Sequence, residues 1–226
     1  SVRLCIRDSF SSAQIAALTT AQVAAITPLG LSSIGTEQIA ALETEDLRVL
    51  GATAIKALTT SQLGALTTAQ VTAMSSTQVA ALGTSQVSAL TTDHIGVLST
   101  QQVAALSSAQ VSALTTAQVA AIETQNVQVL SSTQVRAIST AGIAALSTEQ
   151  VVALTTAQVA NLGTQQVAAL ETADLAAMET SDLVALSNTQ VRSLNTGHIA
   201  SLTTEQAAAL TCLLYTSDAA DERSSV

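Results

Sequence analysis

The residues best suited to metal chemistry are acidic side chains in the segment ETADLAAMETSDL. They are Glu171, Asp174, Glu179 and Asp182. Carboxylate oxygens are preferred ligands of Ca²⁺, so stacked segments could form a weak calcium site. The same residues precede apolar stretches, where the positive end of a helix dipole favours negative charge. We interpret them, and the acidic residues 43–46, as helix-start charges, and keep these four as weak metal candidates only.

The other groups with catalytic potential do not form a recognisable motif. His94 and His198 occupy the same place in a repeated octapeptide, thirteen repeats apart, where Gln usually stands. We therefore expect a structural role for both imidazoles rather than a shared metal. No Ser or Thr stands in a nucleophile–base motif, and no Gly-rich phosphate loop or paired catalytic carboxylate is present. The sequence predicts no enzyme and no cofactor.

Composition and charge exclude further classes of function. The net charge is −9, and only Arg48, Lys56, Arg136 and Arg192 are basic between residues 11 and 210. So few cations predict no binding to nucleic acid and none to anionic membranes. Every octapeptide contains Thr, Ser or Gln, so no apolar run reaches the roughly eighteen residues of a membrane helix. Aromatic residues make up 1% of the chain, which is unlike an ordinary globular core.

The two ends depart from the repeat. CLLYTSDAADE, residues 212–222, resembles the translation of a transposon sequencing adapter, and CIRDS, residues 5–9, resembles its other strand. We therefore interpret residues 1–10 and 211–226 as adapter-derived or non-native. Both cysteines, Cys5 and Cys212, and the only tyrosine, Tyr215, fall in these ends. We expect no disulfide or redox role for them.

Residues 11–210 consist of 25 octads with the pattern [T/S/G/E]-T-x-Q-V-x-A-L, without insertion or deletion. If the first position is the N-cap, the Gln at the fourth position completes a capping box. The preceding Leu and the following Val then form a hydrophobic staple. Pro28 stands directly after Thr27, at the first helical position, where proline is best tolerated. The sequence predicts one helix of about five to seven residues per octad; a cap at the second position is an alternative.

A single octad is too short to be a stable helix, so neighbours must stabilise it. We predict an all-α solenoid with Val, Ala and Leu inside and Thr, Ser and Gln outside. One continuous helix is disfavoured because the apolar stripe would drift by about 80° per octad. A β-solenoid is the alternative, because Thr and Val favour strands. Gly35, Gly51, Gly83 and Gly163 mark helix junctions at multiples of sixteen residues, a hint of two octads per turn.

The unit LTTAQVAAL resembles octapeptide arrays of long, repetitive bacterial surface or secreted proteins. This resemblance implies a non-catalytic spacer or interaction solenoid, a fragment of a larger protein at the cell surface or outside the cell. Ile26-Thr27-Pro28 also resembles the helix start of transcription activator-like effector repeats, but the longer repeat and basic surface of that family are missing here. The expected partner is a protein or surface, with self-association through the solenoid ends. The alternative function is a ligand-binding array for Ca²⁺ or ice.

Overall fold

The computed structural model describes residues 11–210 of the chain. The adapter-like segments, with Cys5, Cys212 and Tyr215, lie outside the described residues. Between residues 11 and 210 each octad contributes a short α-helix, and this part of the chain has no strand. The predicted all-α solenoid with one short helix per octad is therefore confirmed. The β-solenoid alternative is wrong for the part of the chain that is described.

The chain divides into two compact units, Ser1–Ile122 and Glu123–Val226. The helices of the first unit are α1 Ser12–Ala16, α2 Thr20–Ala24, α3 Pro28–Ser32, α4 Thr36–Ala40, α5 Thr44–Val49, α6 Ala52–Ala57, α7 Thr60–Gly64, α8 Thr68–Ala73, α9 Ser76–Ala81, α10 Thr84–Ser88, α11 Thr92–Gly96, α12 Thr100–Ala104, α13 Ser108–Ser112 and α14 Thr116–Ala120. Those of the second are α15 Thr124–Gln128, α16 Ser132–Ala137, α17 Thr140–Ala144, α18 Thr148–Val152, α19 Thr156–Ala160, α20 Thr164–Val167, α21 Thr172–Ala177, α22 Thr180–Val184, α23 Asn188–Val191 and α24 Thr196–Ser201. Another helical run begins at Thr204.

Most helices begin with the predicted capping box, whereas others, such as α5 and α6, have no side-chain cap. In the octad of α14, the backbone N–H of Thr115 donates to Gln118 Oε1 at 2.9 Å. The backbone N–H of Gln118 donates in return to Thr115 Oγ1 at 3.2 Å. Thr115 is extended, with φ −71° and ψ 161°, and the helix starts at Thr116. The first position is therefore the N-cap, and the alternative cap at the second position is wrong. Pro28 is the first residue of α3, after the cap Thr27, as predicted.

The octad ends without any left-handed residue. At the seventh position Ala113 is still near-helical, with φ −87° and ψ −7°. At the eighth position Leu82 is extended, with φ −61° and ψ 142°, and directs the chain into the next cap. The glycines at the first position serve as N-caps with φ near −70°, as at Gly35 and Gly163. No residue of the described chain has a positive φ, so these junctions do not depend on the conformational freedom of glycine.

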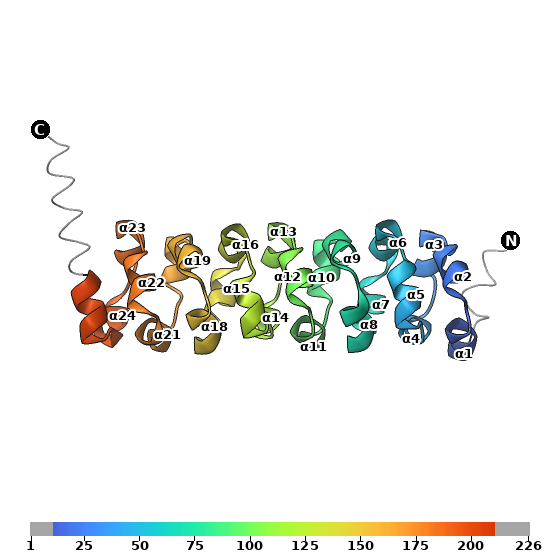
Figure 1. Cartoon of the computed structure of the whole chain (residues 1–226), viewed down its shortest axis with the longest axis horizontal. Coiled ribbons are helices and arrows are strands. Elements are labelled where there is room, and N and C mark those ends of the chain that lie inside the picture. The colour runs from blue at the N-terminus through green and yellow to red at the C-terminus, as the bar shows by residue number, and fades with distance from the viewer. Residues whose placement is uncertain (1–10, 211–226) are drawn as a thin grey trace, which may run out of the picture. The chain divides into compact units, whose positions relative to one another are not determined.

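Within each unit the short helices form a superhelix with between three and four octads per turn. Each helix packs on the third helix after it, as α5 packs on α8 and α18 packs on α21. Side-chain hydrogen bonds of Gln reach the fourth octad before, as from Gln62 to Leu31 O and Ile34 O. Along the upper edge of the first unit in Figure 1 lie α3, α6, α9 and α13, and along its lower edge lie α1, α4, α8 and α11. The two-octad turn suggested by the glycine spacing is therefore wrong.

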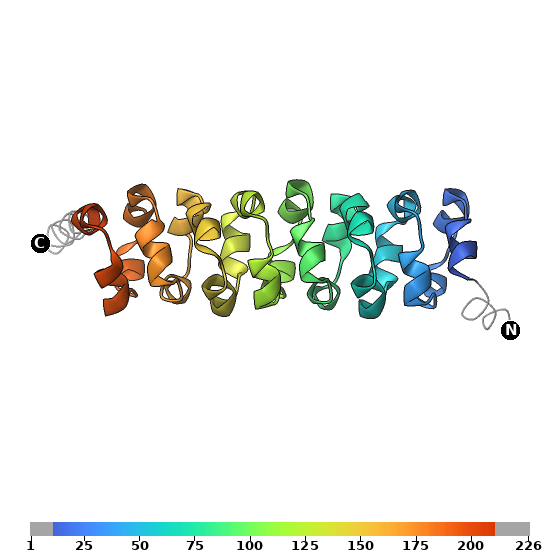
Figure 2. The ribbon, with the colours of Figure 1, turned by 90° about the horizontal axis from the view of Figure 1, so that it is seen from below.

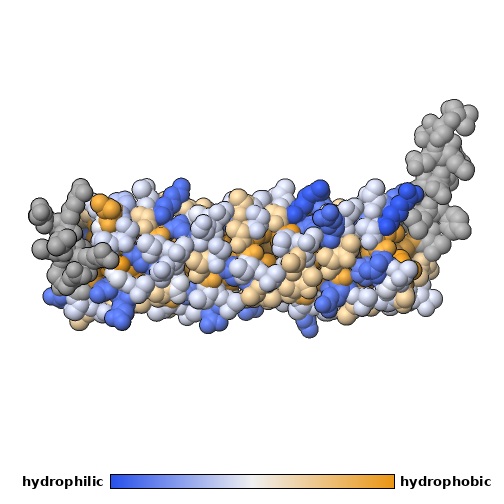
Figure 3. Space-filling model, turned by 180° about the vertical axis from the view of Figure 1, so that it is seen from behind, coloured by the Kyte–Doolittle hydropathy of each residue, from blue (hydrophilic) through white to orange (hydrophobic). Residues whose placement is uncertain are grey.

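The core of each unit is made by three of the eight positions. In one octad Val103 at the fifth position is 1% exposed, Leu106 at the eighth is 6% exposed, and Gln102 at the fourth is 2% exposed. The prediction that Gln faces outward is therefore wrong, whereas that for Val and Leu is confirmed. Alanines at the seventh position, such as Ala105, are half-buried. Figure 2 shows the same helices from below, and Figure 3 shows a face of mostly intermediate hydropathy with scattered strongly hydrophilic residues.

Candidate functional site

The recurring polar feature of both units is a buried amide at the fourth position, which we name the amide latch. Its Oε1 accepts from the backbone N–H of its own N-cap, and its Nε2 donates to two carbonyls four octads earlier. Gln62 Nε2 lies 2.9 Å from Leu31 O and 2.7 Å from Ile34 O. The same pattern joins the side chains of Gln70, Gln78, Gln86, Gln102, Gln110, Gln118, Gln158, Gln166, Gln190 and Gln206 to their acceptors.

Glutamine suits this position because one planar group carries both an acceptor and two N–H donors. The carbonyls it reaches belong to the fifth and eighth positions, at the end of a short helix. The fifth-position carbonyl also accepts from the N–H of the eighth position, as Val71 O accepts from Met74 N. One side chain therefore caps the start of one helix and the end of another. The capping half could be predicted from sequence spacing. The longer-range half could not, because it depends on how many octads make a turn.

His94 occupies the latch position and reproduces the latch geometry. It is 3% exposed, and its Nδ1 accepts from the backbone N–H of Thr91 at 3.3 Å. Its Nε2 lies 2.7 Å from Leu66 O, an acceptor 28 residues earlier. With Nδ1 as the acceptor, Nε2 carries the proton and donates to this carbonyl. The predicted role of His94 as a polar substitute for Gln is therefore confirmed in its geometry.

His198 lies in the second unit and is also buried at a latch position. Its Nδ1 accepts from the backbone N–H of Asn195 at 3.3 Å, and its Nε2 lies 3.3 Å from Asn195 Nδ2. The backbone N–H of His198 donates to Asn195 Oδ1 at 2.9 Å. The contacts of both imidazoles are therefore to backbone groups and one amide, and neither forms a hydrogen bond with a hydroxyl nucleophile among the described residues.

The four weak metal candidates serve the helix starts. Glu171 and Glu179 are exposed N-caps, whereas Asp174 and Asp182 are 1% and 7% exposed at latch positions. Asp174 Oδ1 accepts from Thr148 Oγ1 at 2.9 Å, and its Oδ2 accepts from the N–H of Glu171 at 3.0 Å. Asp182 Oδ1 accepts from Thr156 Oγ1 at 2.7 Å. Across residues 11–210, no three Asp, Glu, His or Cys side chains come together as a metal-binding group.

Asp46 also occupies a latch position, but it lacks the Thr hydroxyl donor that Asp174 and Asp182 have. It is 2% exposed, and its Oδ2 is buried without a hydrogen-bond partner among the described residues. Burial raises the pKa of the Asp46 carboxyl above its ordinary value, and the neighbouring charges of Glu43 and Glu45 raise it further. Sequence reasoning assigned the acidic residues 43–46 a common role. The fourth position distinguishes Asp46 from the others, because that position is buried.

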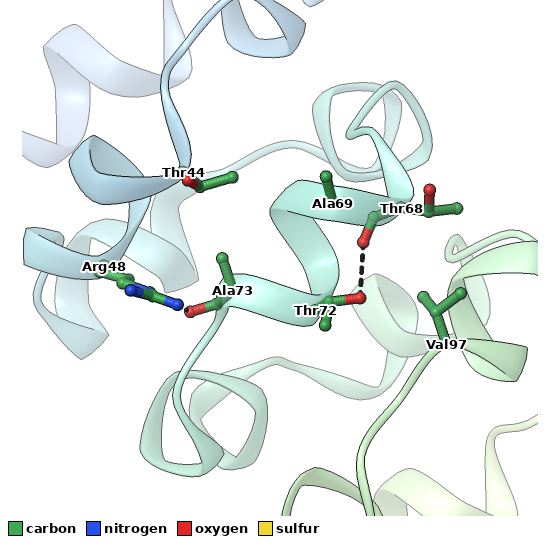
Figure 4. A pocket seen from close by; sticks show the side chains of 7 residues that line it. All are labelled: Thr44, Arg48, Thr68, Ala69, Thr72, Ala73 and Val97. Carbon is green, nitrogen blue, oxygen red and sulfur yellow. Dashed lines mark hydrogen bonds between the residues drawn. The ribbon is translucent and has the colours of Figure 1, made fainter.

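A shallow hollow of about 420 Å³ lies on the surface of the first unit, between helices three octads apart (Figure 4). Its lining consists of Thr44, Arg48, Thr68, Ala69, Thr72, Ala73 and Val97. Arg48 Nε donates to Ala73 O at 3.3 Å, and its Nη1 pairs with Glu45 at 3.1 Å. Thr72 Oγ1 donates to Thr68 O at 2.9 Å. The side chains of Arg48 and Thr72 are thus engaged locally, and the lining contains no Asp, Glu or His.

Charge is segregated along the octad, a signal that sequence reasoning overlooked. Every basic residue between 11 and 210 stands at the sixth position, and every acidic residue stands at the first, third or fourth. The sixth position falls at the end of the helix, where the dipole favours cations, and the first turn favours anions. Arg48, for example, lies in the last turn of α5, and Glu45 and Asp46 lie in its first. The charges of the array are therefore accounted for by helix ends.

Comparison with known proteins concerns the repeat alone. Five segments match the ALTTAQ repeat family, at residues 39–76, 72–100, 95–124, 119–156 and 175–212. No curated protein matches the chain. None of the helices between residues 11 and 210 has the length and apolar character needed to cross a membrane. Because the matched segments cover more than half of the sequence, the chain belongs to the ALTTAQ repeat family.

Proposed function

We propose that this chain is a non-catalytic spacer or interaction array within a larger repetitive protein. Most of the polar groups that could carry chemistry are used by the fold: first-position hydroxyls cap helices, latch amides bind carbonyls, and charges stand at the helix ends that favour them. The resemblance to bacterial arrays supports a setting at the cell surface or outside the cell. No enzymatic activity is part of this proposal.

The observation that supports a spacer most directly is the uniformity of the contacts. Octads within a unit pack on the third octad away and bond to the fourth. An added octad therefore finds the same partners as the one before it, so length can increase without new kinds of interaction. A protein that sets a distance between two other parts needs this property.

Small-angle scattering on chains of different repeat number tests the spacer. Residues 59–114, seven octads of the first unit, are duplicated in place so that the latch spacing is preserved. The proposal expects the maximum dimension to grow in proportion to the number of octads. Growth as the cube root of chain length, which marks a compact globule, would refute it.

We propose a protein or surface partner for the exposed Thr, Ser and Ala side chains, because the low density of charge disfavours nucleic acid. Self-association through the array ends is part of this proposal, since a repeat that binds its third and fourth neighbours is complementary to copies of itself. Light scattering over a hundredfold range of concentration should show assembly. A constant monomer mass would exclude self-association. Retention of the chain on immobilised DNA at physiological salt would contradict a partner other than nucleic acid.

A further inference from the structure

At the latch position of α5, Asp46 stands in place of Gln. A carboxylate acceptor therefore replaces the amide donor found in other octads. In the next octads with Gln, the Nε2 of Gln70 lies 2.9 Å from Ile39 O and 2.8 Å from Leu42 O. The same register, 31 and 28 residues back, assigns the carbonyls of Ile15 and Leu18 to position 46. Asp46 has no N–H to offer these carbonyls when it is ionised.

The side chain at this position differs from a latch amide in length and chemistry. An aspartate is one methylene shorter than a glutamine and ends in oxygens, so it brings no N–H to the place that an amide nitrogen takes elsewhere. The register assigns two carbonyl oxygens to that place, and Asp46 adds its buried Oδ2, which has no hydrogen-bond partner among the described residues. Carbonyl oxygens together with a carboxylate are the ligands that a hard cation prefers.

The other aspartates at latch positions lack this combination. Thr148 Oγ1 donates to Asp174 Oδ1, and Thr156 Oγ1 donates to Asp182 Oδ1, so one oxygen of each carboxylate has a hydroxyl donor. Asp174 has both oxygens engaged, because the N–H of Glu171 donates to Oδ2. Asp174 is therefore a matched control for Asp46: the same octad position and residue, without an unpartnered buried oxygen.

We propose that Asp46, together with the main-chain carbonyls of Ile15 and Leu18, binds a hard metal cation in the space that a latch amide fills elsewhere. The bound cation joins the octad of α5 to the octad of α1, as Nε2 does in other octads. Glu43 and Glu45 are exposed on the same octad and add negative charge near the site. Arg48 does not supply the missing positive charge, because its guanidinium donates to Glu45 and to Ala73 O.

The raised pKa of Asp46 agrees with a carboxylate whose charge lacks a counterion. A proton and a metal ion then compete for the same oxygen. Cation binding is accordingly expected to weaken as the pH falls through the range in which Asp46 is protonated.

Calcium titration of the full chain tests the site by calorimetry and by thermal unfolding followed with circular dichroism. Three proteins are compared at constant ionic strength: the natural sequence, Asp46→Gln, which restores the latch amide, and Asp174→Gln. The proposal expects calcium to raise the melting temperature of the natural chain and of Asp174→Gln. In Asp46→Gln, calcium binding should be at least tenfold weaker, with the protein still folded.

Titrations with monovalent ions test whether the bound cation carries one charge or two. The titration is repeated with potassium and sodium chloride against choline chloride, so that an effect of ionic strength is removed. A response to any of these metal ions that disappears in Asp46→Gln supports the site. The proposal is overturned if the natural chain responds to none of the three, or if Asp46→Gln keeps the whole response.

Discussion

The side-chain amide of Gln102 donates to the carbonyl oxygen of Met74 at 2.8 Å, although 28 residues separate the two along the chain. The same nitrogen donates to Val71 O at 2.8 Å, and Gln102 Oε1 accepts from the N–H of Ser99 at 2.8 Å. One buried side chain thus fixes a helix start and a helix end four octads apart. The fold of each unit repeats this arrangement from octad to octad.

Replacing Gln102 by Ala should destabilise the first unit by about 2–4 kcal/mol, because three buried hydrogen bonds are lost and the N–H of Ser99 loses its side-chain acceptor. The adjacent Gln101 is the matched control, since its side chain is exposed. Gln101→Ala should change the free energy of unfolding by less than about 0.5 kcal/mol. Urea unfolding of both variants measures the difference, and equal values for the two would show that the latch adds no stability.

A capping residue at Gly83 should stabilise the first unit. Gly83 is the N-cap of α10 and makes no side-chain cap, although its N–H donates to Gln86 Oε1 at 2.7 Å. A Cβ at this position would meet its closest atom, Gln86 Oε1, at 3.5 Å, an ordinary contact. Gly83→Ser should raise stability by a few tenths of a kcal/mol to about 1 kcal/mol, through the new cap and a stiffer unfolded chain.

The control for this change is Ser107→Ala, which removes an existing cap of the same kind. Ser107 Oγ accepts from the N–H of Gln110 at 3.2 Å. Its loss should cost about 1 kcal/mol. If thermal melting shows Gly83→Ser to be destabilising while Ser107→Ala has no effect, capping does not govern these helix starts.

Asp46 should make stability depend on pH in the acid range. Because the pKa of Asp46 in the folded chain lies above its ordinary 3.8, the folded state binds the proton more tightly than the unfolded state. Its contribution is fully favourable below that ordinary value and is lost as the pH rises through the folded pKa. Without added metal, the stability advantage of Asp46→Gln over the natural chain should therefore grow as the pH rises. A gap that stays constant with pH would contradict this assignment.

Glu149 should act with the opposite sign. Hydrogen bonds from its own backbone N–H and from the Ser147 hydroxyl lower the pKa of its carboxyl. Its contribution is present above the ordinary value of 4.5 and is lost as the pH falls through the lowered pKa. Comparing Glu149→Gln with the natural chain by thermal melting at several pH values should show the natural chain losing its advantage on acidification. A natural-chain advantage that increases on acidification would reverse the assigned sign.

The sequence determines the local structure of this chain well because the relevant signals lie within one octad. The Thr–Gln spacing predicted the capping box, and Pro28 marked the first helical residue. The burial of Gln could not be predicted in this way, because its acceptors are 28 and 31 residues earlier. Only the number of octads per turn brings them together, and no residue within an octad encodes that number by itself.

The charged residues show the same limit of prediction from sequence. The acidic groups 43–46 and 171–182 read alike in sequence, and both combine exposed and buried carboxylates. Asp174 and Asp182 receive a Thr hydroxyl from the octad three before, whereas a buried oxygen of Asp46 lacks any hydrogen-bond partner in the described chain. Thr20 stands at the corresponding place for Asp46, so the difference lies in side-chain contacts between octads and not in the residue types. The acidic segment chosen from sequence as a metal candidate is therefore not the one that the geometry favours.

The most direct test of the account is a crystal structure of the chain at a resolution that separates side-chain amide orientations by their hydrogen bonds. We expect Gln102 Nε2 near 2.8 Å from both Val71 O and Met74 O, with the equivalent contacts in the other Gln octads. Side-chain amides turned to solvent, or bonded to octads at another separation, would contradict it.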